Sequence, residues 1–516
     1  MAPKAPWPKA PAIYQIYPRS FADSNGDGIG DLAGITARLE HVAGLGVDAV
    51  WLSSIYQSPW ADGGYDICNH GAIHPILGTM EDFDALVAKA HGLGLRVILD
   101  QVLNHTSCEH PWFLAALAGD EAMAARYLFR DARPDGTQPN NWISQFGDPA
   151  WKWAHQRRQF YFHQFLQCQP SLNLRNPDVM AAHRDQLRFW QSHGVDGFRF
   201  DAASSYLWNE ALANNPVASQ WVREHNTGET FNPFAYQEHL HDMLPEASAD
   251  YAANLREWAG ANSWLMAEMT VSIRSYEVAM AFCKSDRLNA AYTSDLPEGS
   301  ASPATIADLL NRADPARTVK WLSSHDNPRH ASGKPGEAAF LATLMAVLPG
   351  PWLIYQGEEW GLPQPDLAKD EVTDPFDLMY WPDGPGREGP RVPMPWDAEA
   401  PHFGFTDGKP WLPMRWNRAE LRAVMADGGL ADIYRDLLRL RREQAWDTAQ
   451  VVRHDHGDDW LTLCLETNHG RVTAWFGWPG AAHPVTHEEA PLFSLGHDSG
   501  FRATICRDDS KGTVAA

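Results

Sequence analysis

Short apolar runs recur along the chain, and segments with helical periodicity separate them. Seven runs predict buried β-strands, at residues 12–18, 47–54, 95–102, 194–202, 263–269, 319–326 and 351–359, and residues 288–296 supply a weaker eighth. Between them, residues 79–94 and 179–194 place apolar side chains at helical spacing and end on glycine. This alternation predicts an α/β fold with parallel strands, and eight units predict a closed (β/α)8 TIM barrel.

The regular spacing is interrupted after the third predicted strand. Residues 104–170 are rich in Trp, Asn, Gln and Pro and are too long for a plain loop, which predicts an inserted subdomain. A helix is expected at 430–443, and alternating strands follow from about residue 449. We therefore expect a catalytic barrel formed by 1–103 and 171–445, an insertion after strand 3 at 104–170, and a β-sandwich-like C-terminal domain at 446–516.

Composition restricts the partners of the protein. The 516 residues are 44% hydrophobic and 21% charged, which is ordinary for a soluble globular protein. A formal net charge of −23 disfavours nucleic acid and anionic membrane surfaces, whereas a neutral substrate is compatible with it. The start of the chain has no apolar leader, no run has transmembrane length, and six cysteines are scattered without pairing motifs. We expect a cytoplasmic monomer or homodimer.

Polar residues gather where the predicted strands end. They are Asp100, Asn104 and His105; Arg199 and Asp201; Glu268; and His325 and Asp326. Because strand side chains alternate, Arg199 and Asp201 point the same way. A charge pair inside a sheet is costly unless a site uses it, although a structural salt bridge at a strand end is the alternative. Three carboxylates from separate strands suit acid, base and nucleophilic work on a glycosidic bond.

The segments that contain these residues resemble a known family. "DQVLNH", "GFRFDAA", "MAEM" and "SHDNPR" are similar to the four signature regions of the α-amylase superfamily of retaining glycoside hydrolases (family 13). "QPSLNLRNP" resembles a fifth region, with Ser171 in place of the usual acid. "YQIYPRSFADSNGDGIGDLAGI", "YQGEEWG" and "GPRVPMPWD" resemble the exo-acting α-glucosidase and oligo-1,6-glucosidase-like branch. The likeness runs in order from about residue 11 to residue 416.

The resemblance implies roles for the three carboxylates. Asp201 would be the nucleophile that forms a covalent glucosyl-enzyme. Glu268 would be the general acid for the leaving oxygen and then the base for water. Asp326 would stabilise the distorted, oxocarbenium-like sugar. Arg199 would keep the nucleophile ionised by its charge and hydrogen bonds.

The same resemblance implies a pocket that holds one glucose. His105 and His325 would hydrogen-bond the sugar hydroxyls, and Tyr65 would lie under the ring. Asp62 would grip the hydroxyls of the non-reducing end, with Arg391 as its partner. These residues would close the pocket and enforce exo action. A further expected lining residue, for which a core role is nearly as plausible, is Phe146.

A cation site is expected near the N-terminus. "DSNGDGIGD" spaces Asp23, Asn25, Asp27 and Asp31 with intervening glycines, like the first part of a calcium loop, but the bidentate glutamate of an EF-hand is missing. The family has a similar loop that binds structural Ca²⁺, with the carbonyl of Ile29 as one ligand. A metal-free polar turn is the alternative.

We therefore expect an exo-acting retaining α-glucosidase that acts on short oligosaccharides and glucosides, with transglucosylation as a side reaction. Ala202 follows the nucleophile, and in related enzymes alanine or threonine there accompanies α-1,4 activity, whereas valine accompanies α-1,6 activity. We therefore expect α-1,4 preference. Two alternatives stay open: a glucosyltransferase or sucrose-active enzyme of the same family, and a non-catalytic relative that serves as a binding or transport subunit.

Overall fold

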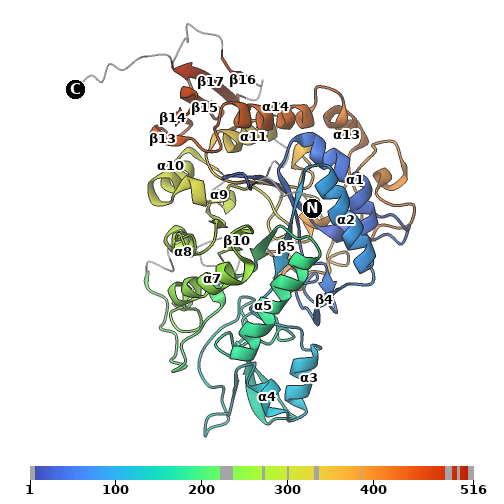
Figure 1. Cartoon of the computed structure of the whole chain (residues 1–516), viewed down its shortest axis with the longest axis vertical. Coiled ribbons are helices and arrows are strands. Elements are labelled where there is room, and N and C mark those ends of the chain that lie inside the picture. The colour runs from blue at the N-terminus through green and yellow to red at the C-terminus, as the bar shows by residue number, and fades with distance from the viewer. Residues whose placement is uncertain are drawn as a thin grey trace, which may run out of the picture.

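The structure is a computed structural model that describes residues 6–220, 223, 236–269, 274–298, 301–330, 336–384, 386–482, 491–496 and 500–508. Its centre is a seven-stranded parallel sheet in the order β11-β10-β9-β5-β2-β1-β12 (Figure 1). The strands are β1 (Ala12–Ile16), β2 (Ala49–Leu52), β5 (Arg96–Gln101), β9 (Gly197–Phe200), β10 (Trp264–Glu268), β11 (Ala290–Tyr292) and β12 (Trp352–Tyr355). The weaker eighth strand expected at 288–296 is therefore present as β11.

The two edge strands of this sheet are joined by one short segment. Thr318 bridges Ala291 of β11, and Lys320 bridges Trp352 of β12, both in parallel orientation. The strand expected at 319–326 is wrong in extent, because regular pairing does not continue past these bridges. The Ser324 hydroxyl accepts the amide of Asp326 at 3.1 Å, and such local side-chain turns compete with sheet pairing. The bridges complete the barrel that the repeating pattern predicts.

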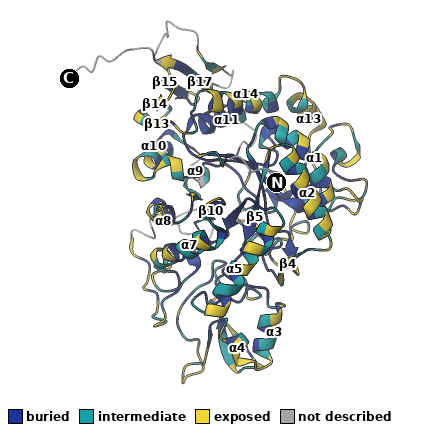
Figure 2. Cartoon of the chain, viewed as in Figure 1, coloured by how far each residue is buried: buried dark blue, intermediate teal, exposed yellow. Residues whose placement is uncertain are grey.

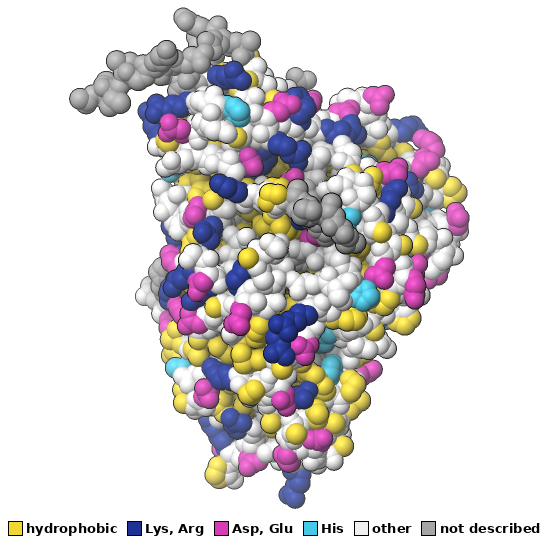
Figure 3. Space-filling view, viewed as in Figure 1, with side chains coloured by type: hydrophobic (Ala, Val, Ile, Leu, Met, Phe, Trp, Pro, Cys, Tyr) yellow, Lys and Arg dark blue, Asp and Glu magenta, His cyan; other side chains and the backbone are white. Residues whose placement is uncertain are grey.

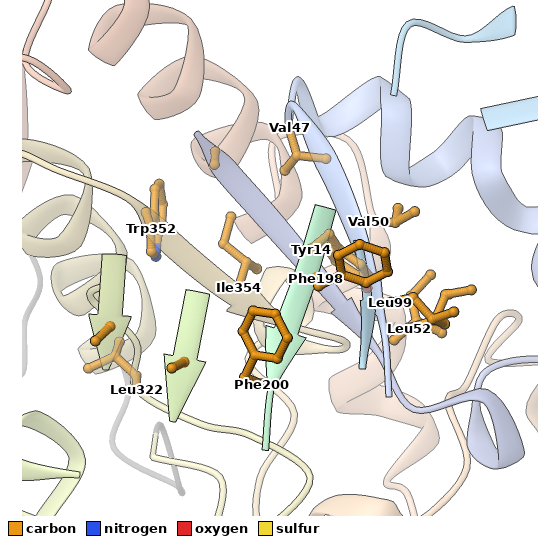
Figure 4. Close-up of a cluster of buried hydrophobic side chains, with 14 of the residues drawn as sticks. Tyr14, Val47, Val50, Leu52, Leu99, Phe198, Phe200, Leu322, Trp352 and Ile354 are labelled. Atoms are coloured by element: carbon orange, nitrogen blue, oxygen red, sulfur yellow. The ribbon is translucent and has the colours of Figure 1, made fainter. Parts of the chain in front are cut away.

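Alternation along the strands separates two apolar layers. Inside the barrel lie side chains such as Ile13, Trp51, Ile98, Met266 and Leu353, all at or near zero exposure. The next positions along the same strands face the surrounding helices. Figure 4 shows part of that outer layer, which includes Tyr14, Val50, Leu99, Phe198 and Ile354.

Helices cover the outside of the barrel, with their buried sides toward the sheet (Figure 2). They are α1 (Leu32–Leu45), α2 (Met80–Gly92), α5 (Pro177–Ser192), α7 (Pro245–Ala259), α8 (Ser275–Phe282), α10 (Pro303–Arg312), α11 (Glu337–Val347) and α14 (Leu430–Glu443). The helices expected at 79–94, 179–194 and 430–443 are confirmed as α2, α5 and α14. Thr79 and Asp82 form a capping box at the start of α2.

Shorter helices belong mostly to the connecting loops. They are α9 (Asp295–Glu298), α12 (Pro375–Met379), α13 (Arg418–Met425) and the 3-10 turns Pro18–Ser20, Ala203–Ser205, Pro315–Arg317, Glu358–Trp360, Gly389–Arg391 and Pro401–Gly404. Strands β3 (Tyr56–Gln57) and β4 (Asn69–Ile73) form a hairpin after β2. These loops matter because several lie at the end of the barrel where the polar side chains gather.

The insertion after β5 has its own small core. It contains α3 (Pro111–Leu117), α4 (Glu121–Ala124) and an antiparallel sheet of β6 (Phe129–Arg130), β8 (Gln159–Phe162) and β7 (Trp151–Ala154). Trp142, Trp151 and Phe162 pack there against Trp208 from the loop after β9. The insertion is thereby anchored to the barrel beside the carboxyl end of β9.

The C-terminal region is one antiparallel sheet in the order β13-β14-β15-β17-β16. Its strands are β13 (Gln450–His456), β14 (Trp460–Thr467), β15 (Gly470–Gly477), β16 (Phe493–Gly496) and β17 (Arg502–Asp508). Among the described residues it is a single sheet and not two stacked sheets, which corrects the sandwich-like expectation. Phe340 of α11 contacts the rings of Phe476 and Phe501, so a barrel helix covers the apolar face.

Charged side chains of both signs lie on the surface of the protein. Acidic and basic side chains are interspersed on the face shown in Figure 3, without one large patch of either sign. All six cysteines are free thiols. No helix in the described ranges combines the length and apolar character needed to cross a bilayer.

At Gly197 the backbone of β9 lies very close to the backbone of β10. A Cβ atom added there would lie 2.4 Å from the carbonyl oxygen of Trp264. We expect Gly197→Ala to lower the free energy of unfolding by about 1–3 kcal/mol, as overpacking does, measured by denaturant unfolding. Gly44 lies in α1 with nothing within 4 Å of its added Cβ, so Gly44→Ala is the control, and equal stability of the two variants would contradict the close contact.

Candidate active site

The centre of the site is the guanidinium of Arg199, which is completely buried. Its Nη1 lies 2.8 Å from Asp100 Oδ1 and 2.5 Å from Asp201 Oδ1, and its Nη2 lies 2.8 Å from Glu268 Oε2. Its Nε donates to the hydroxyl of Tyr292 at 2.8 Å. These residues stand at or just past the carboxyl ends of β5, β9, β10 and β11, so one cation joins four neighbouring strands.

These side chains meet because successive side chains of a strand alternate between its two faces. Asp100 lies two positions after Ile98, and Glu268 two positions after Met266, whose side chains fill the barrel interior. Side chains two residues apart share a face of a strand. The apolar filling of the barrel therefore ends in a polar layer at the face where such barrels place their sites.

One buried cation does not balance three carboxylates. Burial raises the pKa of Glu268 to about 7, and the charges of Asp201 and Asp326 add to this effect while Arg199 opposes it. Burial also raises the pKa of Asp201, with Arg199 opposing and Asp100 adding. The cluster therefore binds a proton near neutral pH. Glu268 is the accessible place for it, since 23% of its side chain is exposed.

The turn after β9 also reaches Glu268. Ala202 has a left-handed backbone, with φ of 43°, which is uncommon for a residue with a side chain. Its amide donates to Glu268 Oε2 at 3.1 Å. Oε2 thus accepts from both Ala202 and Arg199, which leaves Oε1 as the oxygen to hold a proton.

His325 and Tyr65 form a second layer beside this cluster. Gln15 Nε2 donates to His325 Nδ1 at 2.7 Å, and His325 Nε2 lies 2.6 Å from the Tyr65 hydroxyl. That hydroxyl donates to Asp100 Oδ2 at 2.7 Å. Burial lowers the pKa of His325 to about 3, so the imidazole is neutral and carries its proton on Nε2. The sequence-predicted Tyr65 and His325 are therefore brought together with the Arg199 cluster.

His105 and Asp62 are connected through Gln169. The amide nitrogen of Gln169 lies 3.1 Å from His105 Nε2 and donates to Asp62 Oδ2 at 2.8 Å. Burial lowers the pKa of His105 to about 4, so this histidine is also neutral. Within the described ranges, Asp62 Oδ1 is buried and accepts no hydrogen bond. An unsatisfied buried acceptor of this kind suits a ligand hydroxyl.

Asp326 lies between two arginines. Its Oδ1 is 2.7 Å from Arg391 Nη2 and 2.8 Å from Arg387 Nη2. Burial alone would raise the pKa of Asp326, but His325, whose Nε2 lies 3.1 Å from Asp326 Oδ2, and the guanidiniums of Arg387 and Arg391 lower it well below the usual range. Asp326 is therefore held ionised, in contrast to Glu268.

The expected pairing of Asp62 with Arg391 is wrong. Arg391 pairs with Asp326 and with Asp374, and its Nε donates to the carbonyl of His325 at 2.7 Å. These contacts engage all three nitrogens of its guanidinium. Asp62 instead faces Arg387, whose Nη2 lies 3.5 Å from Asp62 Oδ1.

Phe146 is buried where the insertion meets the long loop after β12. Its ring contacts Phe376 with centroids 5.0 Å apart, and its carbonyl accepts a hydrogen bond from Tyr380. These are the contacts of a packing residue. A role in lining the sugar pocket stays a prediction.

The expected cation loop carries its oxygen atoms in a compact turn. Asp23 Oδ1 accepts the amides of Asn25 and Gly26, and Asp27 Oδ1 accepts the amide of Ile29. Asp31 differs, because its carboxylate caps α1.

The donor chemistry of this loop fits a hard cation. Carboxylate, amide and carbonyl oxygens are the ligands that Ca²⁺ takes, and Asp23, Asn25, Asp27 and the carbonyl of Ile29 would supply them. Both oxygens of Asp23 and both oxygens of Asp31 already accept hydrogen bonds, and Asp31 fits least because its carboxylate also caps α1. Among the described residues no three Asp, Glu, His or Cys side chains are grouped as a metal site. Calcium binding therefore stays a prediction. It requires the side chain of Asn25 and the backbone carbonyl of Ile29 to act as ligands beside the carboxylates.

Several site residues escaped the sequence analysis as ligands or partners. They are Gln15, Gln169, Tyr292, Asp374 and Arg387, and Asp100, although placed at a strand end from the sequence, had no partner assigned to it. Asp100 and Gln169 begin two of the quoted motifs, and Arg387 lies four residues before Arg391, so these three had a local signal. Asp374 had none, since it lies in an aperiodic loop.

The chain matches known proteins in three comparisons. The family model described as "Alpha amylase, catalytic domain" matches residues 15–449. The chain is 41% identical over 461 residues to a "Probable alpha-glucosidase" of Rhizobium meliloti (strain 1021), covering 86% of this chain and 84% of that protein. It is 35% identical to "Maltase 1" of Drosophila virilis, covering 85% and 73%. The crystal structure of an alpha-glucosyl transfer enzyme superposes with a TM-score of 0.90 at 35% identity, covering 98% and 100%.

Proposed function

Since this chain belongs to the alpha-amylase family of glycoside hydrolases, we propose that it is an exo-acting retaining α-glucosidase. Its substrates are short α-glucosides, from which it releases glucose at the non-reducing end. The observation that carries the proposal is that one buried guanidinium binds both Asp201 and Glu268. A retaining mechanism needs two carboxyls about 5–5.5 Å apart, and binding to one guanidinium brings the carboxyls of Asp201 and Glu268 close together.

The first step is an exchange of bonds at the anomeric carbon. Asp201 attacks this carbon, the glycosidic C–O bond breaks, and Glu268 donates its proton to the leaving oxygen. The product is a covalent glucosyl-enzyme. Asp326, held ionised by Arg387 and Arg391, stabilises the positive charge that develops on the sugar.

The second step releases the sugar with its configuration retained. Glu268 accepts a proton from water, the water oxygen bonds to the anomeric carbon, and the bond to Asp201 breaks. Asp201 and Glu268 return to their initial protonation states. Gln169 and Arg387 orient Asp62 toward the non-reducing end of the glucose, and this closure of the pocket supports exo action.

A glucosyl-transfer reaction is the second candidate function. The same covalent intermediate reacts with a sugar or alcohol hydroxyl in place of water, and Glu268 accepts the proton in the same way. The observation that favours it is the close superposition on a glucosyl transfer enzyme. The retained carboxylates argue against the third reading, a non-catalytic binding subunit.

Covalent trapping tests the proposed nucleophile. We expect a fluorinated α-glucoside with a good leaving group to add the mass of one fluoroglucosyl group to the protein, on the peptide that contains Asp201. Asp201→Asn should lower kcat by about 10⁴ or more, since it removes the nucleophile. Peptide mass spectrometry locates the label. A label on Asp326, or a wild-type protein that neither hydrolyses nor is labelled by α-glucosides, would overturn the proposal.

The pH profile tests the proposed acid. Burial raises the pKa of Glu268 to about 7, so the acid holds its proton below that pH and loses it above. We therefore expect kcat/KM for maltose to fall as pH rises through about 7, since this profile reports the free enzyme. Glu268→Gln should lose this limb and should lower activity far less on activated aryl glucosides than on maltose. An alkaline limb that persists unchanged in Glu268→Gln contradicts the assignment.

Linkage preference is expected to depend on Ala202, which is buried directly after Asp201. We expect kcat/KM on maltose to exceed that on isomaltose by about 10- to 200-fold, the range available to a methylene-sized difference in shape. Ala202→Val should narrow the ratio. Ala202→Gly is the matched control, because glycine accepts the left-handed backbone without strain. Faster turnover of isomaltose by the wild type would refute the α-1,4 preference and leave the carboxylate roles intact.

A further inference from the structure

Asp374 is a buried carboxylate that contacts Arg387 and Arg391 of the site. It precedes α12 on the long loop after β12, and its side chain is 0% exposed. Its Oδ1 accepts the amides of Phe376 and Asp377 at 2.9 and 3.0 Å. Its Oδ2 lies 2.9 Å from Arg391 Nη1 and 3.6 Å from Arg387 Nη1. One oxygen therefore fixes the carboxylate to the backbone, and the other faces both arginines.

The two arginines bind a second carboxylate on their opposite side. Asp326 Oδ1 lies within 2.8 Å of both guanidiniums. Asp374, Arg391, Asp326 and Arg387 thus form a ring in which negative and positive groups alternate. Two neighbouring guanidiniums repel each other, and anions on both sides of them offset this repulsion. Asp326 supplies the anion that faces the sugar pocket, and Asp374 supplies the anion behind.

The loop itself holds Asp374 in place. Glu388 Oε2 accepts the amide of Thr373 at 2.5 Å and also the amide of Asp374. Asp377 accepts the amides of Gly386 and Glu388 at 2.7 and 2.8 Å. These bonds clamp the start and the end of the segment 373–391 together. The backbone segments that carry Asp374 and the two arginines are therefore joined to each other within the loop itself.

We propose that Asp374 is a positioning residue of this site, the common counter-ion that keeps Arg387 and Arg391 aligned on Asp326. The inference rests on the proposed glucosidase function, because it assigns a consequence to the orientation of Asp326. Without the rear carboxylate, the two guanidiniums repel each other and shift around Asp326. Asp326 acts most strongly on the charged, distorted sugar of the transition state, so the loss falls on kcat more than on KM.

The decisive variant is Asp374→Asn. Asparagine caps a helix as well as aspartate does, so the bonds to α12 are kept while the charge is removed. We expect kcat for maltose and for an aryl α-glucoside to fall about 10- to 100-fold, the range typical for loss of an orienting partner, with a much smaller change in KM. Asp374→Glu keeps the negative charge, so its kcat should be higher than that of Asp374→Asn.

Asp120→Asn is the matched control. Asp120 caps α4 through the amide of Met123 at 3.1 Å, and no ion pair to an arginine is formed by it in the described part of the chain. Rates are expressed per active site, counted by trapping with the fluorinated glucoside, so that unfolded protein does not contribute.

The outcomes separate the two proposals. Asp374→Asn with wild-type kcat per active site, or equal losses in Asp374→Asn and Asp374→Glu, overturns the counter-ion role while leaving the glucosidase intact. A wild type that neither hydrolyses nor is labelled by α-glucosides overturns the proposed function itself. A fall in kcat for Asp374→Asn, partial recovery in Asp374→Glu and an unchanged Asp120→Asn support the positioning role.

Discussion

The buried guanidinium of Arg199 is the interaction on which the site depends. A charge without water is tolerated only when opposite charges and hydrogen bonds surround it. Here Asp100, Asp201 and Glu268 supply the charges, and Tyr292 accepts the remaining bond. Each partner comes from a different strand end, so the register of four parallel strands has to be correct before the ion cluster can form. The barrel and the cluster therefore specify each other.

Two electrostatic environments lie side by side in the pocket. Around Arg199 carboxylates outnumber the cation, and the pKa of Glu268 is raised to about 7. Around Asp326, His325 and the two arginines together outweigh the effect of burial, and the pKa of Asp326 is lowered. Carboxyl groups whose pKa values are pushed apart in this way take different roles. One can carry a proton at neutral pH, and the other stays charged against a positive sugar.

Periodicity predicted the parts of the molecule that repeat. The helices at 79–94 and 430–443 and the strand-end positions of Asp201 and Glu268 followed from spacings of 3.6 and 2 residues. The strand at 319–326 was predicted too long, because the hydroxyl of Ser324 forms a local turn that an apolar pattern does not reveal. The loop after β12 has no period at all. Arg391 was therefore assigned to the wrong carboxylate, and Arg387 and Asp374 were missed.

The barrel strands and the loop after β12 hold groups with different roles in the reaction. Asp201 and Glu268 are fixed by barrel strands, whose register cannot shift without flipping side chains to the other face. Arg387, Arg391 and Asp374 come from a segment that is clamped to itself by Glu388 and Asp377. Asp326 is the group that both parts hold. A change in the loop therefore acts on the site mainly through Asp326, and through Asp62 and His325, which the loop arginines also contact, while the bond-forming pair stays where the barrel puts it.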